Sequence, residues 1–171
     1  MLIDQKAELD RISSEASRTK EGARIRLFIS YSHADTDMFD LFKSRNLAAM
    51  AMDGLISTWT DRQIPLGANW DGTIKKELEA ANVVLCLVST PFFASEYIRG
   101  VEMKRAMELH EQGKLKVIPV LLEDCPAWER SELRQLQGIV PDGKPVRFND
   151  RRPADAFNVV ERELAKMIRE E

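Results

Sequence analysis

The sequence predicts an α/β domain with a parallel sheet and helices on both faces. Short runs of Val, Ile, Leu and Phe alternate with longer amphipathic stretches along residues 24–168. The short runs are almost continuously apolar, as expected of parallel strands that are covered on both faces. Because strand and helix alternate five times, right-handed crossovers between parallel strands are expected.

Five segments are expected to form strands. They are residues 24–32 with the exit loop included, 55–59, 83–88, 115–122 and 145–148. Pro119 lies inside the fourth segment and predicts a bulge or a locally unpaired amide, because proline has no N–H to donate. The fifth segment is short and is expected at an edge. Five strands in such a domain favour a flavodoxin-like five-stranded sheet in the order 2-1-3-4-5.

Helical spacing predicts the remaining elements. They are residues 36–52, 71–81, a helix from near Ser95 to near Gly113, a short helix within 129–137, and 154–167. Gly113 is typical of a C-terminal helix stop. Residues 1–23 carry a weak apolar stripe and predict a helical extension, which either lies on the domain or serves as a linker or oligomerisation helix. We therefore divide the chain into an extension, 1–23, and a domain, 24–171.

Composition excludes several classes of protein. The chain has 171 residues and a net charge of −3, so its composition does not indicate the basic face that nucleic-acid binding usually needs. Cys86 and Cys125 have no metal-type spacing, and Cys86 is expected to be a small buried apolar residue. His33 and His110 are far apart, so no metal site is expected. The apolar runs are too short to span a membrane, and no signal peptide begins the chain. We expect a cytoplasmic protein.

The order 2-1-3-4-5 places a ligand crevice beyond the carboxyl ends of strands one and three. Common nucleotide motifs are absent there, because the first strand ends without GxGxxG and no Gly-Lys-Ser/Thr follows. No GxSxG elbow occurs, and the third strand does not end in the aspartate that a phosphorylated receiver domain needs. The candidate groups at the crevice are Ser30, Tyr31, Ser32, Ser89, Phe92, Ser95 and Tyr97.

Glu102 stands out in the helix that follows the crevice. Helical spacing puts it on the side that faces the sheet, among Ile98, Ala106 and Leu109. A buried carboxylate is costly unless it is paired or hydrogen-bonded. Two readings remain open, namely a structural ion pair with a neighbouring arginine (Arg99 or Arg105) and the working group of a site.

Several segments resemble the boxes of Toll/interleukin-1 receptor (TIR) domains. Residues 25–35, IRLFISYSHAD, resemble the opening box, and residues 61–67, DRQIPLG, resemble the second. Residues 95–106, SEYIRGVEMKRA, resemble the third segment, especially in bacterial members. Residues 117–122 and 125–128 are also similar to the bacterial branch. The resemblance covers about residues 24–168 and leaves out the N-terminal extension.

This resemblance implies either an enzyme that cleaves NAD at the nicotinamide–ribose bond or a protein–protein adaptor. In enzymatic members a glutamate on the helix after strand three is essential, and Glu102 matches it. Many members carry an aromatic residue four positions earlier, whereas Tyr97 precedes Glu102 by five. Nicotinamide leaves as a neutral molecule, so one carboxylate that stabilises an oxocarbenium-like ribose is sufficient. The other product is ADP-ribose or a cyclic ADP-ribose, and NAD is substrate rather than cofactor.

The resemblance also assigns roles to the remaining groups. Tyr97 and Phe92 would pack on the nicotinamide or ribose, although Phe92 could instead anchor the core. Hydrogen bonds would come from Ser30, Tyr31, Ser32 and Ser89. The loop after strand two, which takes part in self-association in this family and completes a neighbouring subunit's site, comprises Asp61, Arg62, Ile64, Pro65, Leu66 and Gly67.

We therefore expect a NAD glycohydrolase that is activated by association with other TIR domains, as a homo-oligomer or filament, in immune or anti-phage defence signalling. One alternative is an adaptor or effector that acts through TIR–TIR contacts without NAD turnover. Another is a nucleoside deoxyribosyltransferase-like enzyme, against which the box pattern argues.

Overall fold

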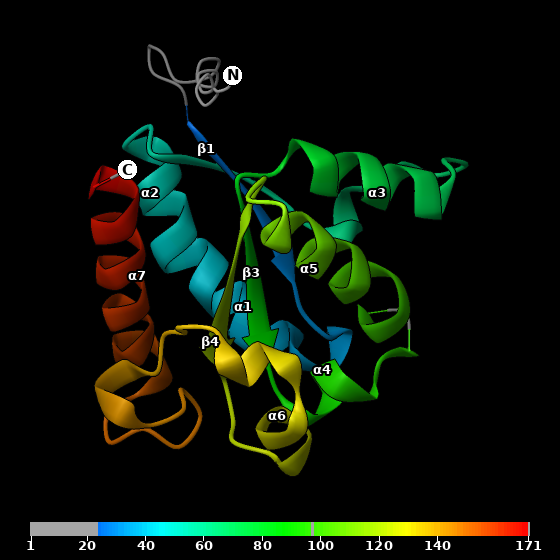
Figure 1. Cartoon of the computed structure of the whole chain (residues 1–171). Helices are drawn as coiled ribbons and strands as arrows, with labels where there is room; N and C mark the ends of the chain where they lie inside the picture. The colour runs from blue at the N-terminus through cyan, green and yellow to red at the C-terminus, as the bar shows by residue number, and fades with distance from the viewer. Residues whose placement is uncertain (1–23, 97, 171) are drawn as a thin grey trace.

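A parallel sheet in the order β2-β1-β3-β4 forms the centre of the domain (Figure 1). The computed structural model describes residues 24–96 and 98–170. The strands are β1 (Ile25–Ser30), β2 (Ile56–Trp59), β3 (Val83–Val88) and β4 (Lys116–Leu121). All six residues of β3 are buried, as its uninterrupted apolar sequence predicts.

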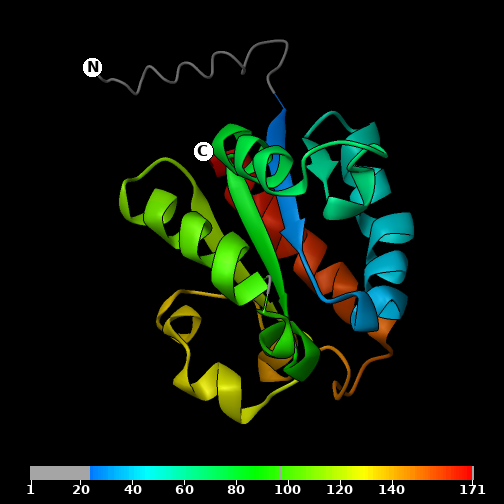
Figure 2. The same ribbon diagram turned by 90° about the vertical axis from the view of Figure 1, so that its right-hand side faces the viewer.

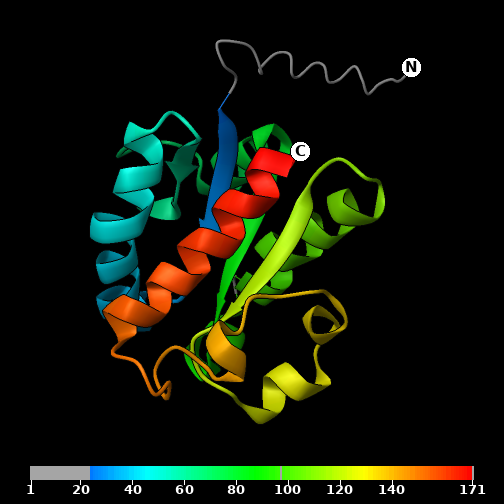
Figure 3. The same cartoon turned by 90° about the vertical axis from the view of Figure 1, so that its left-hand side faces the viewer.

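Helices cover both faces of the sheet. One face packs against α1 (Thr36–Phe42), the π-helix η2 (Lys43–Leu47), α2 (Ala48–Met52) and α7 (Pro153–Glu170), as Figure 3 shows. The other face packs against α3 (Trp70–Ala80), the π-helix η4 (Ile98–Glu102) and α5 (Met103–Glu111), as Figure 2 shows. The two cores meet at the sheet, whose strands contribute alternate side chains to each.

Short elements gather beyond the carboxyl ends of the strands. They are the 3-10 turns η1 (His33–Asp35), η3 (Asp61–Gln63), η5 (Glu132–Gln135) and η6 (Pro141–Gly143), together with the short helices α4 (Thr90–Ala94) and α6 (Pro126–Arg130). The predicted short helix at 129–137 is therefore two separate turns, which begin earlier than expected. This edge of the sheet is where the strand order predicts a ligand crevice.

The prediction of a fifth strand at 145–148 is wrong, because the sheet of the described residues has four strands. Two different segments share the outer edge of β4. Ile139 forms a single bridge with Val120, and the Val146 N–H donates to the Leu121 carbonyl at 3.0 Å. Pro145 has no N–H with which to extend this contact into a ladder.

Pro119 is accommodated without a bulge. The register of β3 and β4 runs unbroken through the pair Cys86–Pro119. The Pro119 carbonyl accepts from the Ile139 N–H at 2.8 Å, so this residue directs its backbone groups to the outer edge. Of the two predicted consequences of Pro119, the structure therefore shows the missing amide donor and not the bulge. Cys86 is fully buried in β3, as predicted.

The helix after the third strand differs from the prediction. A short α4 precedes it, and the helix itself opens as the π-helix η4 before it continues as α5. The predicted stop at Gly113 is confirmed, because this glycine has a φ of 75° just beyond α5. The predicted helical extension over residues 1–23 lies outside the described residues. Among the described helices, none has the length and apolar content of a membrane span.

Candidate functional site

Glu102 lies at the carboxyl end of β1, one of the two inner strands of the sheet. It is the last residue of η4, and only 3% of its surface is exposed. The hydroxyl of Ser30, the last residue of β1, donates to Oε1 of Glu102 at 2.7 Å. The prediction that Glu102 lies on the helix side that faces the sheet is confirmed, since Ile98, Ala106 and Leu109 are also buried. Ser30, one of the residues predicted to line the crevice, thus contacts Glu102 directly.

The π-helical turn explains how Glu102 reaches this position. A π turn closes with i→i+5 bonds and inserts one extra residue into an α-helix. Here it spans Ile98–Glu102, so the turn that ends at the carboxylate is one residue longer than an α-helical turn. The sequence places one extra residue between Tyr97 and Glu102. Tyr97 itself lies outside the described residues.

The surroundings of Glu102 favour its protonated form. Burial raises its pKa from 4.5 to about 7, whereas the Ser30 hydrogen bond opposes the rise. Asp61 raises the pKa further through its charge, and His33 lowers it. Glu102 is therefore divided between its neutral and ionised forms near neutral pH, which is where an acid or base of a site can work.

The ion-pair reading of Glu102 finds no support at Arg105. This guanidinium donates to Glu79 through Nε at 2.8 Å and to Glu108 through Nη1 at 3.0 Å. The Arg99 side chain lies outside the described residues. Among the described residues, the side chain that contacts the Glu102 carboxylate is the Ser30 hydroxyl, and a hydroxyl does not compensate a buried negative charge.

His33 and Asp61 form a second polar pair at the same edge. His33 Nε2 lies 3.1 Å from Asp61 Oδ1, and the His33 and Asp61 side chains are 62% and 16% exposed. His33 belongs to η1, which follows β1, and Asp61 opens η3, which follows β2. From the sequence, His33 was considered only as a possible metal ligand. Its position directly after the first strand, with an acid after the second, is the signal that was available.

Arg62 holds the beginning of the loop after β2 against α1. Its guanidinium donates to Thr36 Oγ1 at 2.8 Å and to Asp40 Oδ1 at 3.2 Å. It also lies 5.6 Å from the ring centres of both Tyr31 and Phe39. The loop is therefore tied down at its start by one side chain with polar and aromatic contacts.

The tip of the same loop is apolar and open. Leu66 is fully exposed, and Gly67 follows it with a φ of 82°. Ile64 is partly buried and packs against the core on the α3 side, while the Pro65 carbonyl accepts from the Ala68 N–H at 3.1 Å. A fixed turn thus presents one large apolar side chain to the outside.

Tyr31 lies beneath the loop. It is 4% exposed and stacks on Phe39 with ring centres 4.2 Å apart. Its hydroxyl is buried and makes no hydrogen bond with the described residues. Burial raises the pKa of Tyr31 to about 12, so the hydroxyl keeps its proton.

Three of the predicted serines cap short helical segments. Ser32 accepts from the Ala34 N–H at 3.2 Å, and Ser95 accepts from the Ile98 N–H at 3.2 Å. Ser89 accepts from the Phe92 N–H at 3.1 Å. Phe92 is completely buried in the core, which agrees with its reading as an anchor. These groups shape the loops around the crevice.

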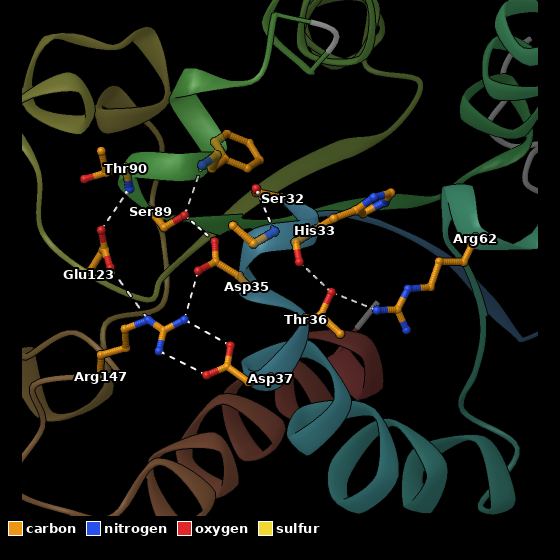
Figure 4. A network of polar contacts seen from close by, with 12 residues as sticks. Ser32, His33, Asp35, Thr36, Asp37, Arg62, Ser89, Thr90, Glu123 and Arg147 are labelled. Carbon is orange, nitrogen blue, oxygen red and sulfur yellow. Dashed lines mark hydrogen bonds and ion pairs between the residues drawn. The ribbon is translucent and has the colours of Figure 1, made fainter.

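A network of charged groups joins the loops that surround the crevice (Figure 4). Ser89 donates to the buried carboxylate of Asp35, which also accepts from Arg147 Nη2 at 2.9 Å. Arg147 contacts Asp37 at 3.2 Å, and its Nε lies 3.6 Å from Glu123. The exits of β1, β3 and β4 are thereby fixed to one another. The sequence analysis missed this network.

Comparison with known proteins identifies the chain. The family model described as TIR domain matches residues 27–158. The chain belongs to the TIR domain family. Glu102, Ser30, His33 and Asp61 all fall within the matched residues of this TIR domain.

One curated relative shares 38% identity over 120 residues, an uncharacterized protein named y4lF from Sinorhizobium fredii. The match covers 70% of this chain and 36% of that protein, so the chain spans about a third of its length. Two solved TIR domains have the same fold. The TIR domain of the Toll-related receptor TRR-2 from Hydra magnipapillata is 18% identical with a TM-score of 0.51, covering 84% of this chain and 97% of that one. The TIR domains of the activated Roq1 resistosome are 19% identical with a TM-score of 0.50, covering 84% and 74%.

Hollows on the surface of the described residues of this TIR domain include three that lie away from Glu102. One of about 110 Å³ lies beside Trp59, one of about 480 Å³ between α2 and α7, and one of about 380 Å³ beside Leu47. None of the three is lined by Glu102 or Ser30. Within residues 24–96 and 98–170, no three metal-ligating side chains come together as a metal site.

Proposed function

We propose that this TIR domain cleaves NAD at the nicotinamide–ribose bond, with Glu102 as the catalytic residue. One observation carries the proposal. A carboxylate is buried at the carboxyl end of β1, held by the Ser30 hydroxyl at 2.7 Å, and has a pKa raised to about 7 chiefly by burial. Within the described part of the chain this carboxylate has a hydroxyl as its hydrogen-bond partner, whereas an acid that only stabilised the fold is expected to have a cation or several backbone donors.

The cleavage needs little more from the protein than a negative charge held close to the ribose. When the bond between the ribose C1′ and the nicotinamide nitrogen breaks, the bonding electrons pass to the cationic pyridinium ring, and neutral nicotinamide leaves. Positive charge develops on the ribose. Glu102 in its ionised form stabilises this charge, and its effect is strong because the site is shielded from water. Water then completes ADP-ribose, or the adenine attacks and closes a cyclic product.

Because Glu102 is almost completely covered, NAD can reach it only after a neighbouring segment moves, and the proposed segment is the loop beyond Asp61, residues 62–67. Only 3% of Glu102 is exposed, and Arg62 fastens the start of the loop to α1. Exposed Leu66 at the tip offers a partner an apolar contact. We infer that another TIR domain binds this loop and thereby opens the site. The Roq1 TIR domains belong to an activated resistosome, which supports activation by assembly. Immune or anti-phage defence signalling is the proposed setting.

A second candidate is an adaptor that associates through the same loop without turning over NAD. The exposed Leu66 and the covered Glu102 favour this reading, since together they describe a ready contact surface and a closed site. The two candidates differ in one observable, the release of nicotinamide.

The experiment incubates the concentrated full chain with NAD and follows nicotinamide by chromatography. The wild type should release it, and Glu102→Ala should reduce the rate at least ~100-fold because a major charge-stabilising group is lost. Glu96→Ala is the matched control, since Glu96 is a nearby exposed acid, and it should keep the activity. Absence of release from the wild type under assembly-promoting conditions, or equal release from Glu102→Ala, favours the adaptor.

A further inference from the structure

The exposed His33–Asp61 pair lies beside Glu102 but takes no part in breaking the nicotinamide bond as described above. His33 Nε2 and Asp61 Oδ1 are 3.1 Å apart. His33 is the more open of the two, with 62% of its side chain exposed against 16% for Asp61. His33 lies three residues beyond Ser30, whose hydroxyl donates to Glu102 at 2.7 Å. Asp61 follows the neighbouring strand β2, so the pair lies at the same edge of the sheet as Glu102. An imidazole hydrogen-bonded to a partly buried carboxylate is the arrangement of a general base.

We propose that His33, oriented by Asp61, accepts the proton of the water that attacks the ribose and thereby directs the reaction toward hydrolysis. This inference rests on the proposed NAD cleavage. His33 would be a second catalytic residue, and Asp61 would be a positioning residue that acts through it. The choice between the linear and the cyclic product would then depend on these two side chains.

The proton has a complete route in this scheme. A lone pair of the water oxygen forms the bond to C1′, and one water proton passes to the imidazole. With the Nε2 hydrogen donated to Asp61, Nδ1 is the acceptor, and the resulting imidazolium is stabilised by the carboxylate. His33 then releases the proton to solvent, because its ring is exposed. The balance is NAD⁺ and water giving ADP-ribose, nicotinamide and one proton.

The neighbouring groups are less suited to this step. Glu102 is only 3% exposed and already accepts from Ser30 at Oε1, and its charge is needed by the ribose. The Tyr31 hydroxyl is buried and keeps its proton. Arg62, which lies over Tyr31, is a cation without acceptor capacity. Among these described groups, His33 alone combines an exposed side chain with an acceptor nitrogen.

A competing nucleophile separates proton transfer from the earlier steps. When 3-acetylpyridine replaces water, its ring nitrogen attacks C1′ and forms an NAD analogue without losing a proton. This exchange needs Glu102 and the bound ribose but needs no general base. The ratio of hydrolysis to exchange therefore reports on the base, and it does not depend on how much of the protein is folded or assembled.

The experiment measures this ratio with NAD and 3-acetylpyridine for four full-length proteins. They are the wild type, His33→Gln, Asp61→Asn and the control His110→Gln, in which the histidine of α5 is changed. His33→Gln keeps a donor for Asp61 but loses the base, so the ratio should fall by about 10²-fold while exchange continues. Asp61→Asn should lower the ratio less, and His110→Gln should leave it unchanged.

Two results overturn the inference. If hydrolysis and exchange fall together in His33→Gln, or if the ratio stays at the wild-type value, His33 is not the base and the proposed NAD cleavage stands. If the wild type supports neither reaction, the proposed function itself fails and this inference fails with it.

Discussion

The Ser30 hydroxyl donates to Oε1 of Glu102 at 2.7 Å across 72 residues of sequence. This bond joins the end of β1 to the turn that starts α5. Two opposing effects meet in it, because burial raises the pKa of Glu102 and the hydroxyl lowers it, with a result of about 7. The fold therefore holds a buried acid whose ionised form destabilises the folded state, and the first and last expectations below depend on this cost.

Removing the charge of Glu102 should stabilise the domain at alkaline pH. The folded pKa, about 7, exceeds the usual 4.5, so the folded state loses stability as pH rises from 4.5 to 7. Glu102→Gln has no such loss, and it should be more stable than the wild type by about 3 kcal/mol above pH 7. This advantage should disappear below pH 4.5. Urea unfolding at pH 8 and pH 4 checks the expectation, and an equal difference at both values would contradict it.

The sequence predicted the features that depend on local apolar spacing. The boundaries of β3 are as predicted, and Glu102 lies on the face that helical spacing gives it. These are strong patterns because one face or both faces must be buried. The order of the four strands followed from the flavodoxin-like fold class, and it correctly placed Ser30 near the helix that carries Glu102.

Features that depend on competition between distant segments were not predictable in the same way. The segment at 145–148 has the composition of a strand, but Ile139 occupies the edge of β4 beside Val120. The contact between Arg147 and Asp35 spans 112 residues, and no local pattern marks it. Ser32, Ser89 and Ser95 were expected at the crevice as ligand groups, and this role stays a prediction. In the structure their hydroxyl oxygens accept from nearby backbone N–H groups, a use that the sequence alone does not distinguish.

Leu66 should be needed for self-association but not for stability. Its side chain is fully exposed at the tip of the 61–67 loop, so Leu66→Asp removes an apolar contact with a partner while the monomer loses nothing that is buried. We expect weaker assembly by analytical ultracentrifugation and an unchanged urea midpoint. Met52→Asp is the matched control, because Met52 is 87% exposed at the other end of the strands. Equal assembly by Leu66→Asp and the wild type would refute this role.

Arg147 should contribute much more to stability than its exposed partner Asp37. Arg147→Met leaves the carboxylate of Asp35, which is 2% exposed, without its cation. Such a loss costs about 3–5 kcal/mol. Asp37→Asn removes an ion pair made by a side chain that is itself 62% exposed, which costs less than about 1 kcal/mol. Urea unfolding of the two variants tests the contrast, and equal losses would show that the network does not depend on the buried pair.

The pH dependence of nicotinamide release, compared between the wild type and Ser30→Ala, tests most directly whether ionised Glu102 performs the cleavage. In the wild type, kcat/KM should rise with pH through a midpoint near 7, the pKa of Glu102 in the free protein. Ser30→Ala removes the hydrogen bond that lowers this pKa, so the midpoint should move upward by about one unit. A profile without this acid limb, or the same midpoint in both proteins, would contradict the assignment.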